Sequence, residues 1–421
     1  MLSSDTYDSN QIHVKAKGWD DNRKRLFEKR VAALLNHKDF VVLHVPDDDG
    51  SKLKLVKPAK NAYHQERMIQ KINACENNPT TWYALSHYWG PAKAKGELWT
   101  DISNHLDDEH GEPINPEGNN PIWMRSEKRG TLLTLLRAYP DSYWWIDVLC
   151  ARTDTPLDIM GDIYACCTQS ISMIDCPPGI ISEIHTMKNL DPHFPRASDK
   201  EEIGFDEYFS QYEELNELFL SLTQCEWWKR VWTWQEMVLP QDILFLSETT
   251  TNVSDENMLC MDDLDHYEAM LGRMILCCMR HGTRTLHAPT TAFKELKTSR
   301  KFNTYRVSDK KELASLITLF DTFGGSTRVC MDPSDYVYGV LGVLQFEIPR
   351  MANPKEVWHD FLSELDNFVE AYVCNQSSSQ MDVPPPSLFT INDRARHLDL
   401  TTVKNMSDVY RDLLIEYNCT I

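Results

Sequence analysis

The chain has 421 residues, of which 42% are hydrophobic and 25% are charged, as is typical of a globular protein rather than a disordered one. Its formal net charge is −20 and no basic stretch dominates, which argues against a nucleic-acid-binding protein. None of the 12 cysteines lies in a Cys-x-x-Cys pair or at a spacing typical of zinc ligands. We therefore expect no nucleic-acid partner and no metal site.

The sequence shows neither a secretion signal nor a membrane-spanning segment. The N-terminal residues lack the apolar stretch of a signal peptide, and the chain contains no run of 18 apolar residues. We therefore expect a cytoplasmic protein that has reduced cysteines and no membrane span.

The first part of the chain, residues 1–75, predicts a lead-in made of a helix and a β-hairpin. A helix is expected over residues 21–35. Apolar strands are expected at 40–45 and 53–56, and a turn rich in Asp and Pro separates them. A second helix, over residues 61–76, leads into the next region.

Residues 76–250 predict an α/β core, because short apolar runs typical of buried strands alternate with helical patterns. The expected strands lie at 82–86, 143–148, 170–175 and 243–246, and the expected helices at 126–138, 158–169, 208–223 and 226–238. The βαβαβ order favours a parallel sheet between two layers of helices. The polar residues 91–120 are expected to form a surface loop, and residues 176–205 an irregular segment.

The rest of the chain predicts mainly helices. Residues 251–376 form a helical region, with helices expected at 256–279, 310–323, 333–344 and 354–372. Residues 377–421 form a linker and a C-terminal tail. The linker over 377–387 contains three consecutive prolines, and a helix is expected in the tail over 400–421.

The segment over residues 83–90 places polar side chains at the end of a predicted buried strand. Ligands of open parallel sheets bind at the carboxyl ends of the strands, so Ser86 and His87 are expected to face a crevice. Gly90 would permit a tight turn there. The alternative is a capped strand in which Trp89 belongs to the hydrophobic core.

A second segment repeats this arrangement, because Asp147 follows an apolar run that includes Trp144 and Trp145. A carboxylate beside apolar neighbours must be hydrogen-bonded or paired, or its pKa rises. Asp147 either orients a ligand hydroxyl, or caps the following turn, or pairs with Arg152.

The third segment, residues 230–236, contains the strongest candidate for a catalytic group. Trp232 and Glu236 are four residues apart and would share one face of a helix, whereas Arg230 is too far round that helix to be a neighbour of Glu236 by spacing alone. A Glu in a pocket lined by Trp is suited to act as a general base or to stabilise a cation, because partial burial raises its pKa. The alternative is a solvated Glu on a helix whose tryptophans pack inward.

A cluster of acidic residues, Asp262, Asp263 and Asp265, allows two interpretations. Such carboxylates can bind Mg²⁺. Because the cluster precedes a predicted helix, it can equally provide the negative charge that is favourable at a helix N-terminus.

Together with residues 332–342, the three segments resemble, in the same order, the fungal heterokaryon-incompatibility (HET) domain family. The first segment matches at residues 83–90, with His87 where Tyr is usual, and the second matches at 145–150. The third matches completely at 230–236. The fourth, Asp-Pro-x-Asp-x-Val-Tyr-x-x-Leu-Gly, matches at 332–342, so the resemblance covers roughly residues 38–345.

The resemblance implies a fold and an activity. HET domains are similar to TIR domains, which have a flavodoxin-like parallel sheet with helices on both faces. In the TIR domains that cleave NAD, the Glu of a Trp-x-x-x-Glu pair is catalytic, and Trp232 and Glu236 match this spacing. The implied reaction is cleavage of the nicotinamide–ribose bond, with NAD as a substrate and no resident cofactor.

The resemblance also assigns roles to the other segments and indicates partners. Ser86, Trp89 and Asp147 would line the crevice, and Arg230 or Arg152 would meet a phosphate. The implied partners are a small-molecule or dinucleotide ligand and a second copy of the chain, in self-recognition and cell-death signalling.

One departure from the family pattern keeps two other functions open. After Cys150 the chain continues Ala-Arg-Thr-Asp, where the family usually has Ile-x-Gln. If that Gln positions the ligand, its loss changes the substrate or abolishes the activity. One alternative is therefore a non-catalytic module that signals by self-assembly. The other is a scaffold turned to small-molecule biosynthesis, as a cyclase or an isomerase.

Overall fold

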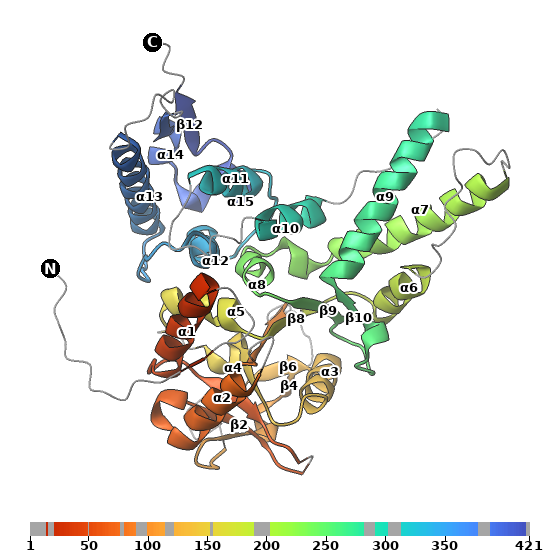
Figure 1. The fold of residues 1–421 in the computed structure, drawn as a ribbon, viewed down its shortest axis with the longest axis vertical. Coiled ribbons are helices and arrows are strands. Elements are labelled where there is room, and N and C mark those ends of the chain that lie inside the picture. Colours follow the sequence, from red (N-terminus) through yellow and green to blue (C-terminus); the bar gives the residue numbers. More distant parts are fainter. Residues whose placement is uncertain are drawn as a thin grey trace.

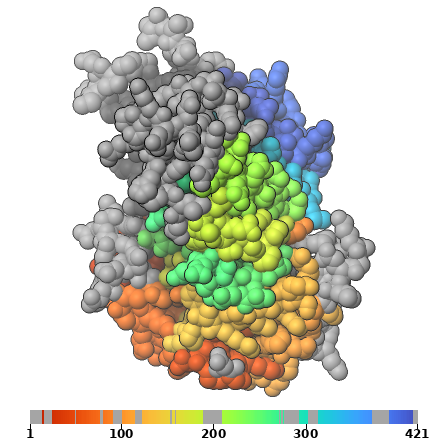
Figure 2. Space-filling view, turned by 90° about the vertical axis from the view of Figure 1, so that its right-hand side faces the viewer, coloured from red at the N-terminus to blue at the C-terminus, as the bar shows by residue number. Residues whose placement is uncertain are grey.

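The computed structural model places one eight-stranded sheet at the centre of the molecule, with helices around it and a helical region beside it (Figure 1). It describes residues 14–15, 21–48, 50–75, 80–89, 99–113, 122–151, 155–188, 203–281, 291–301, 313–377 and 388–417. In Figure 2, the N-terminal residues (red and orange) and the C-terminal residues (blue) lie at opposite ends of the molecule.

Four parallel strands form the centre of the sheet. They are β3 (Tyr83–His87), β7 (Ser142–Ile146), β8 (Gln169–Ile174) and β9 (Ile243–Ser247). Their order across the sheet is β7-β3-β8-β9, and each neighbouring pair is parallel. Numbered along the chain this is 2-1-3-4, the order of flavodoxin-like folds, so the predicted α/β class is confirmed. The chain leaves β3 and β8 in opposite directions, and in open α/β sheets ligands bind outside the carboxyl ends of the strands at such a point.

The outer strands of the sheet come from both sides of this core. The predicted hairpin is confirmed, because β1 (Val42–Val45) pairs antiparallel with β2 (Leu53–Val56). Strand β1 also pairs antiparallel with β7, and β2 pairs parallel with β5 (Leu106–Asp108). At the other edge, β10 (Met258–Cys260) pairs antiparallel with β9. The lead-in and the start of the C-terminal part therefore extend the same sheet.

Helices surround the sheet because its central strands are buried on both faces, which requires apolar cover. The helices before and within the core are α1 (Asp21–Leu35), α2 (Ala62–Ala74), α3 (Ser126–Arg137), α4 (Asp147–Cys150), α5 (Leu157–Cys166), α6 (Pro178–Lys188), α7 (Ile203–Thr223) and α8 (Thr233–Val238). The later helices are α9 (Met261–His281), α10 (Thr291–Lys301), α11 (Leu313–Gly324), α12 (Asp335–Leu344), α13 (Pro354–Ser377), α14 (Asp393–Arg396) and α15 (Met406–Tyr410).

The C-terminal helices share a hydrophobic core with the sheet. One cluster of buried side chains joins Trp145 of β7 and Trp234 of α8 to Phe323 of α11 and Tyr410 of α15. Helices α5 and α12 cross closely, because a Cβ added to Gly342 would lie 2.8 Å from the Cα of Gly161. Only glycine at both positions permits this approach.

Four expected elements were wrong in part. The insertion over 91–120 contains β5 and also β4 (Trp99–Asp101), which pairs with β6 (Trp123–Arg125). The segment over 176–205, expected to be irregular, contains α6. In both segments, pairing or packing against the core overrides a polar, turn-rich composition.

The other two corrections concern helices. The helix expected over 226–238 is two pieces, a 3-10 helix (Glu226–Lys229) and α8, because Arg230 between them is extended and its backbone bridges to Val329. The helix expected in the tail is only α15, and β12 (Leu414–Tyr417) pairs with β11 (Leu388–Ile391) instead. Most of the expected linker, residues 378–387, lies outside the described residues.

Candidate functional site

Ser86 and Glu236, from the first and third segments, meet at the carboxyl edge of the sheet. The Ser86 hydroxyl, at the end of β3, donates a hydrogen bond to the Glu236 carboxylate. The indole N–H of Trp227 donates to Ser86 Oγ over 2.8 Å. All three side chains are buried, and Glu236 is only 4% exposed. The crevice expected between β3 and β8 is therefore filled by a hydrogen-bonded chain that ends on a carboxyl group.

The surroundings of Glu236 make it a group that can exchange a proton near neutral pH. Burial raises its pKa from 4.5 to about 7, and the negative charge of Asp147 adds to this effect. The cations Arg230 and Arg328 and the hydrogen bond from Ser86 act in the opposite direction. A carboxyl group with a pKa near the ambient pH can serve as an acid, as a base or as a counter-charge to a cation.

A second polar group forms around Asp147, at the end of β7. Its carboxylate accepts hydrogen bonds from Trp89 Nε1 at 2.9 Å and from Val148 N at 2.6 Å, and it lies 3.1 Å from His87 Nε2. Burial opposes ionisation of Asp147, yet the neighbouring His87 and these hydrogen bonds hold its pKa below the ordinary value. The alternative that placed Trp89 in the hydrophobic core is wrong, because Trp89 is 51% exposed.

His87 adds a hydrogen-bond acceptor, its Nδ1, to this group. Burial and the nearby Lys128 lower the pKa of His87, which favours the neutral imidazole. A carboxylate only accepts hydrogen bonds, so Nε2 carries the proton toward Asp147 and Nδ1 keeps its lone pair. This Nδ1 is buried and has no hydrogen-bond partner among the described residues. It can therefore accept a hydrogen bond from a ligand or a water molecule.

Arg230 joins the third segment to the first. It is extended and lies between the 3-10 helix and α8, so the helical spacing considered above does not apply to it. Its guanidinium donates to the carbonyl oxygen of His87 at 2.9 Å and lies 5.9 Å from the ring centroid of Tyr88. Gly90 and Arg152, two other expected ligand-binding residues, lie outside the described residues.

The described hydrogen bond of Trp232 is to a residue of α12 and not to Ser86, Glu236 or Asp147. Trp232 immediately precedes α8, and its indole hydrogen-bonds the carboxyl group of Asp335 on α12. Burial raises the pKa of Asp335 to about 6, and this hydrogen bond opposes the rise. The tryptophan that contacts the Glu236 cluster is instead Trp227. Trp227 was not among the residues predicted from the sequence, where its only signal was an aromatic residue close to Arg230.

The buried Lys128 is a second residue near the site that was not predicted from the sequence. Lys128 of α3 is 1% exposed, and its ammonium group donates to the carbonyl oxygen of Tyr88 and lies 3.1 Å from Glu248 Oε2. Arg125 also pairs with Glu248. Burial lowers the pKa of Lys128 to about 7. Its contact with Tyr88 fixes the chain just after β3, between His87 and Trp89.

Within the acidic cluster at the start of α9, Asp263 caps the helix. Asp263 Oδ2 accepts a hydrogen bond from Cys260 N at 2.8 Å, and Asp265 pairs with Lys297 at 2.9 Å. Within the described part of the chain, no three His, Cys, Asp or Glu side chains are grouped so that they could hold a metal ion. The capping interpretation therefore accounts for Asp263.

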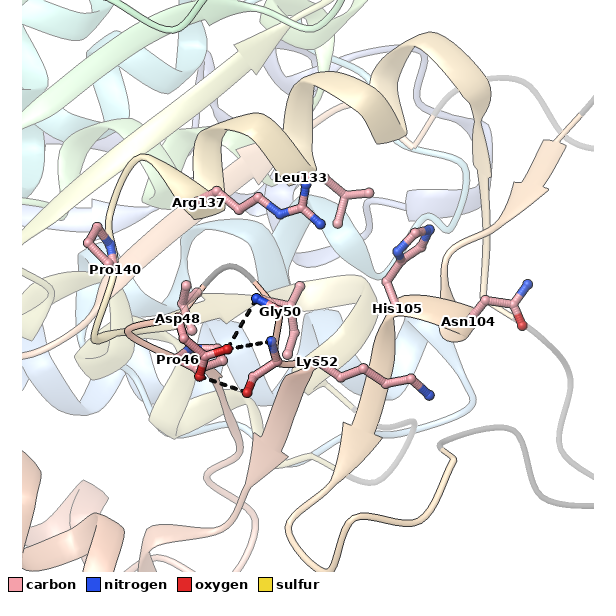
Figure 3. Close-up of a pocket in the computed structure, with 12 residues that line it drawn as sticks. Pro46, Asp48, Gly50, Lys52, Asn104, His105, Leu133, Arg137 and Pro140 are labelled. Atoms are coloured by element: carbon pink, nitrogen blue, oxygen red, sulfur yellow. Dashed lines mark hydrogen bonds between the residues drawn. The ribbon is translucent and has the colours of Figure 1, made fainter.

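Two cavities lie apart from this cluster. One, of about 260 Å³, is lined by residues such as Asp48, Lys52, His105 and Arg137 (Figure 3). It lies at the opposite edge of the sheet, because its lining residue Val45 pairs with Ser142 at the amino end of β7. The other, of about 520 Å³, lies between α1, α5 and α12.

The fold and the site define an α/β protein that buries a proton-exchanging carboxyl group at the carboxyl edge of a parallel sheet. The family model described as Heterokaryon incompatibility protein (HET) matches residues 82–236, which begin just before β3 and end at Glu236. The chain therefore carries a HET domain over this segment, and the resemblance to the HET family is confirmed for residues 82–236. No curated protein and no solved structure matches the chain. The described helices include none that is long and apolar enough to cross a membrane.

Proposed function

We propose that this protein cleaves NAD at the nicotinamide–ribose bond as part of a heterokaryon-incompatibility-type response. The observation that carries the proposal is the buried Glu236, which accepts a hydrogen bond from Ser86 and has a pKa of about 7. It is also the last residue of the matched HET segment.

The reaction needs a group that accommodates a developing positive charge. When the bond between ribose C1′ and the nicotinamide nitrogen breaks, the electron pair leaves with nicotinamide and the ribose becomes cationic. The ionised Glu236 stabilises that cation in a site of low dielectric constant. A water molecule then attacks C1′ and passes a proton to the carboxylate. The products are nicotinamide, ADP-ribose and one proton.

The surrounding groups support recognition of such a substrate. Arg230 offers a cation that can meet a phosphate, although its guanidinium is bonded here to the carbonyl of His87. The half-exposed ring of Trp89 offers a surface on which a flat base can stack. Since Glu236 itself is buried, a substrate reaches it only after the side chains that cover it move apart. A closed site suits a protein that acts only when triggered.

A second candidate function, signalling by self-assembly without catalysis, is favoured by exposed apolar side chains near Arg230. The backbone of Arg230 bridges to Val329, which is exposed, and Met331 nearby is fully exposed. Under this alternative, Met331→Lys reduces self-association measured by sedimentation, and Glu236→Gln leaves it unchanged.

Nicotinamide release from NAD by concentrated purified protein tests the first proposal. We expect release by the wild type and none by Glu236→Gln. Glu226→Gln is the matched control, because Glu226 is exposed on the preceding 3-10 helix and its change should leave release intact. Release that persists in Glu236→Gln, or is absent from the wild type, would refute the proposal.

A further inference from the structure

Two arginines from outside the matched HET segment, the buried Arg328 and the partly buried Arg300, bind the two ends of α8, the helix that carries Glu236. At the first end, the guanidinium of Arg328 donates to the carbonyl oxygen of Arg230 at 3.0 Å and to the hydroxyl of Thr233. The Thr233 hydroxyl in turn donates to the same Arg230 carbonyl at 2.7 Å. Arg328, which is 2% exposed, therefore fixes the backbone where the chain turns into α8.

The charge of Arg328 is balanced by a partner from α10. Its Nε lies 3.3 Å from Glu295 Oε2, and Glu295 is itself buried. The guanidinium also lies 5.4 Å from the ring centroid of Trp234, which faces inward from α8. A buried ion pair is costly unless further hydrogen bonds satisfy both charges. The bonds to Arg230 and Thr233 supply them on the arginine side.

Arg300, which also belongs to α10, binds the other end of α8. Its guanidinium donates to the carbonyl oxygens of Met237 at 2.7 Å and Pro240 at 3.1 Å, and also to that of Gln241. The last carbonyl groups of a helix have no partner within it, and a cation there is favourable. Figure 1 shows α10 beside α8.

These contacts matter because α8 has little stability of its own. It contains six residues, far fewer than an isolated helix needs, and no side chain caps its first residue. The direction in which Glu236 points therefore depends on groups outside α8. The four contacts of Arg328 and Arg300 with backbone carbonyls are the kind that fix such a short helix at both ends.

We propose that Arg328 and Arg300 are positioning residues for Glu236, so that α10 and Arg328 complete the site whose other residues lie in the HET segment. The catalytic consequence rests on the proposed NAD cleavage, whereas the positioning of Glu236 does not. The electrostatic surroundings agree with this role, because the Arg328 cation favours the ionised form of Glu236. Arg230, Asp147 and Tyr164 face the same carboxyl group from other elements.

The test uses the full chain and a double variant, Arg328→Met with Glu295→Met. Removing both charges avoids an unpaired buried ion, which a single substitution would leave behind. Arg396→Met is the matched control, because Arg396 forms an exposed ion pair with Asp366 on α13, away from α8. Circular dichroism and thermal unfolding confirm that each variant is folded. Arg300→Lys, which keeps the charge but loses the forked contacts, is the conservative variant.

The first readout is independent of catalysis. NMR titration of ¹³C-labelled Glu side chains, with Glu236→Gln to assign the signal, gives the pKa of Glu236. We expect a higher pKa in the folded double variant and no change in Arg396→Met. An unchanged pKa and chemical shift of Glu236 in the folded double variant would overturn the proposal, even if NAD is cleaved.

The second readout is the rate of nicotinamide release. We expect a fall of about 100-fold in kcat with little change in KM for the double variant, because a displaced catalytic group loses rate rather than binding. A smaller fall is expected for Arg300→Lys. If the wild type does not cleave NAD, the proposed function fails while the NMR result still decides the positioning role. Wild-type kcat in the double variant would overturn the proposal.

Discussion

Ser86 and Glu236 are 150 residues apart in the sequence, yet the hydroxyl of one donates a hydrogen bond to the carboxylate of the other. The contact joins the end of β3 to α8, and the indole N–H of Trp227 donates a hydrogen bond to the same hydroxyl of Ser86. The pKa of this buried carboxyl group lies near neutrality, because burial outweighs the stabilisation of its charge by Ser86 and the nearby arginines.

Burial of Glu236 predicts a characteristic dependence of stability on pH. Its pKa rises from 4.5 to about 7 in the folded protein. A raised carboxyl pKa means that the folded state binds the proton more tightly than the unfolded state, so stability is lost as the pH rises through this range. At about 1.4 kcal/mol for each pKa unit, the loss is on the order of 3 kcal/mol.

Glu236→Gln removes this loss, because the amide does not ionise. We expect the free energy of unfolding of the variant to gain roughly 3 kcal/mol relative to the wild type between about pH 4.5 and pH 8. Urea denaturation of both proteins at several pH values measures the difference. The contributions of the other titrating groups cancel in it, because both proteins contain them. A difference that stays constant across this range would show that Glu236 titrates as an ordinary exposed carboxyl group.

Ser86→Ala is expected to destabilise the protein by about 1–3 kcal/mol, because it leaves the buried Trp227 N–H unpaired and removes a donor from Glu236. Ser172 is the matched control. It is the neighbour of Ser86 across the sheet, is equally buried, and its hydroxyl has no hydrogen-bond partner among the described residues. Ser172→Ala should therefore be neutral or slightly stabilising. Equal effects of the two substitutions on urea unfolding would contradict the assigned hydrogen bonds.

Gly342→Ala is expected to destabilise the protein by about 1–3 kcal/mol through overpacking. The added Cβ would lie 2.7 Å from Gln235 Oε1 and 2.8 Å from the Cα of Gly161. Gly130→Ala is the control, because that glycine lies in α3 with no atom within 4 Å of an added Cβ. It should stabilise the protein by up to about 1 kcal/mol, since Ala favours helix. Thermal unfolding separates the two, and a harmless Gly342→Ala would show that α5 and α12 are not in close contact.

The sequence predicts the central strands well because each is a short apolar run buried on both faces. It also places Ser86 and Asp147 each at the carboxyl end of such a run, and the carboxyl ends of the parallel neighbours β3 and β7 share one edge. These predictions depend on local patterns and on the general geometry of parallel sheets.

Features that depend on contacts between distant residues could not be predicted from the sequence. The break at Arg230 arises from a bridge to Val329, about 100 residues later, and nothing in the local pattern indicates it. The same break leaves Arg230 outside the helix that spacing predicted, while Trp227 comes to lie against Ser86. Lys128 was equally hidden, because a lysine in a helical pattern reads as a solvated residue.

The pH dependence of nicotinamide release is the measurement that tests the account most directly. Ionised Glu236 stabilises the ribose cation, so kcat/KM should rise with pH and level off above a midpoint of about 7. Glu236→Gln should abolish release at every pH. A rate that does not change between about pH 5 and pH 9, or that survives in Glu236→Gln, would contradict the central role of this buried carboxyl group.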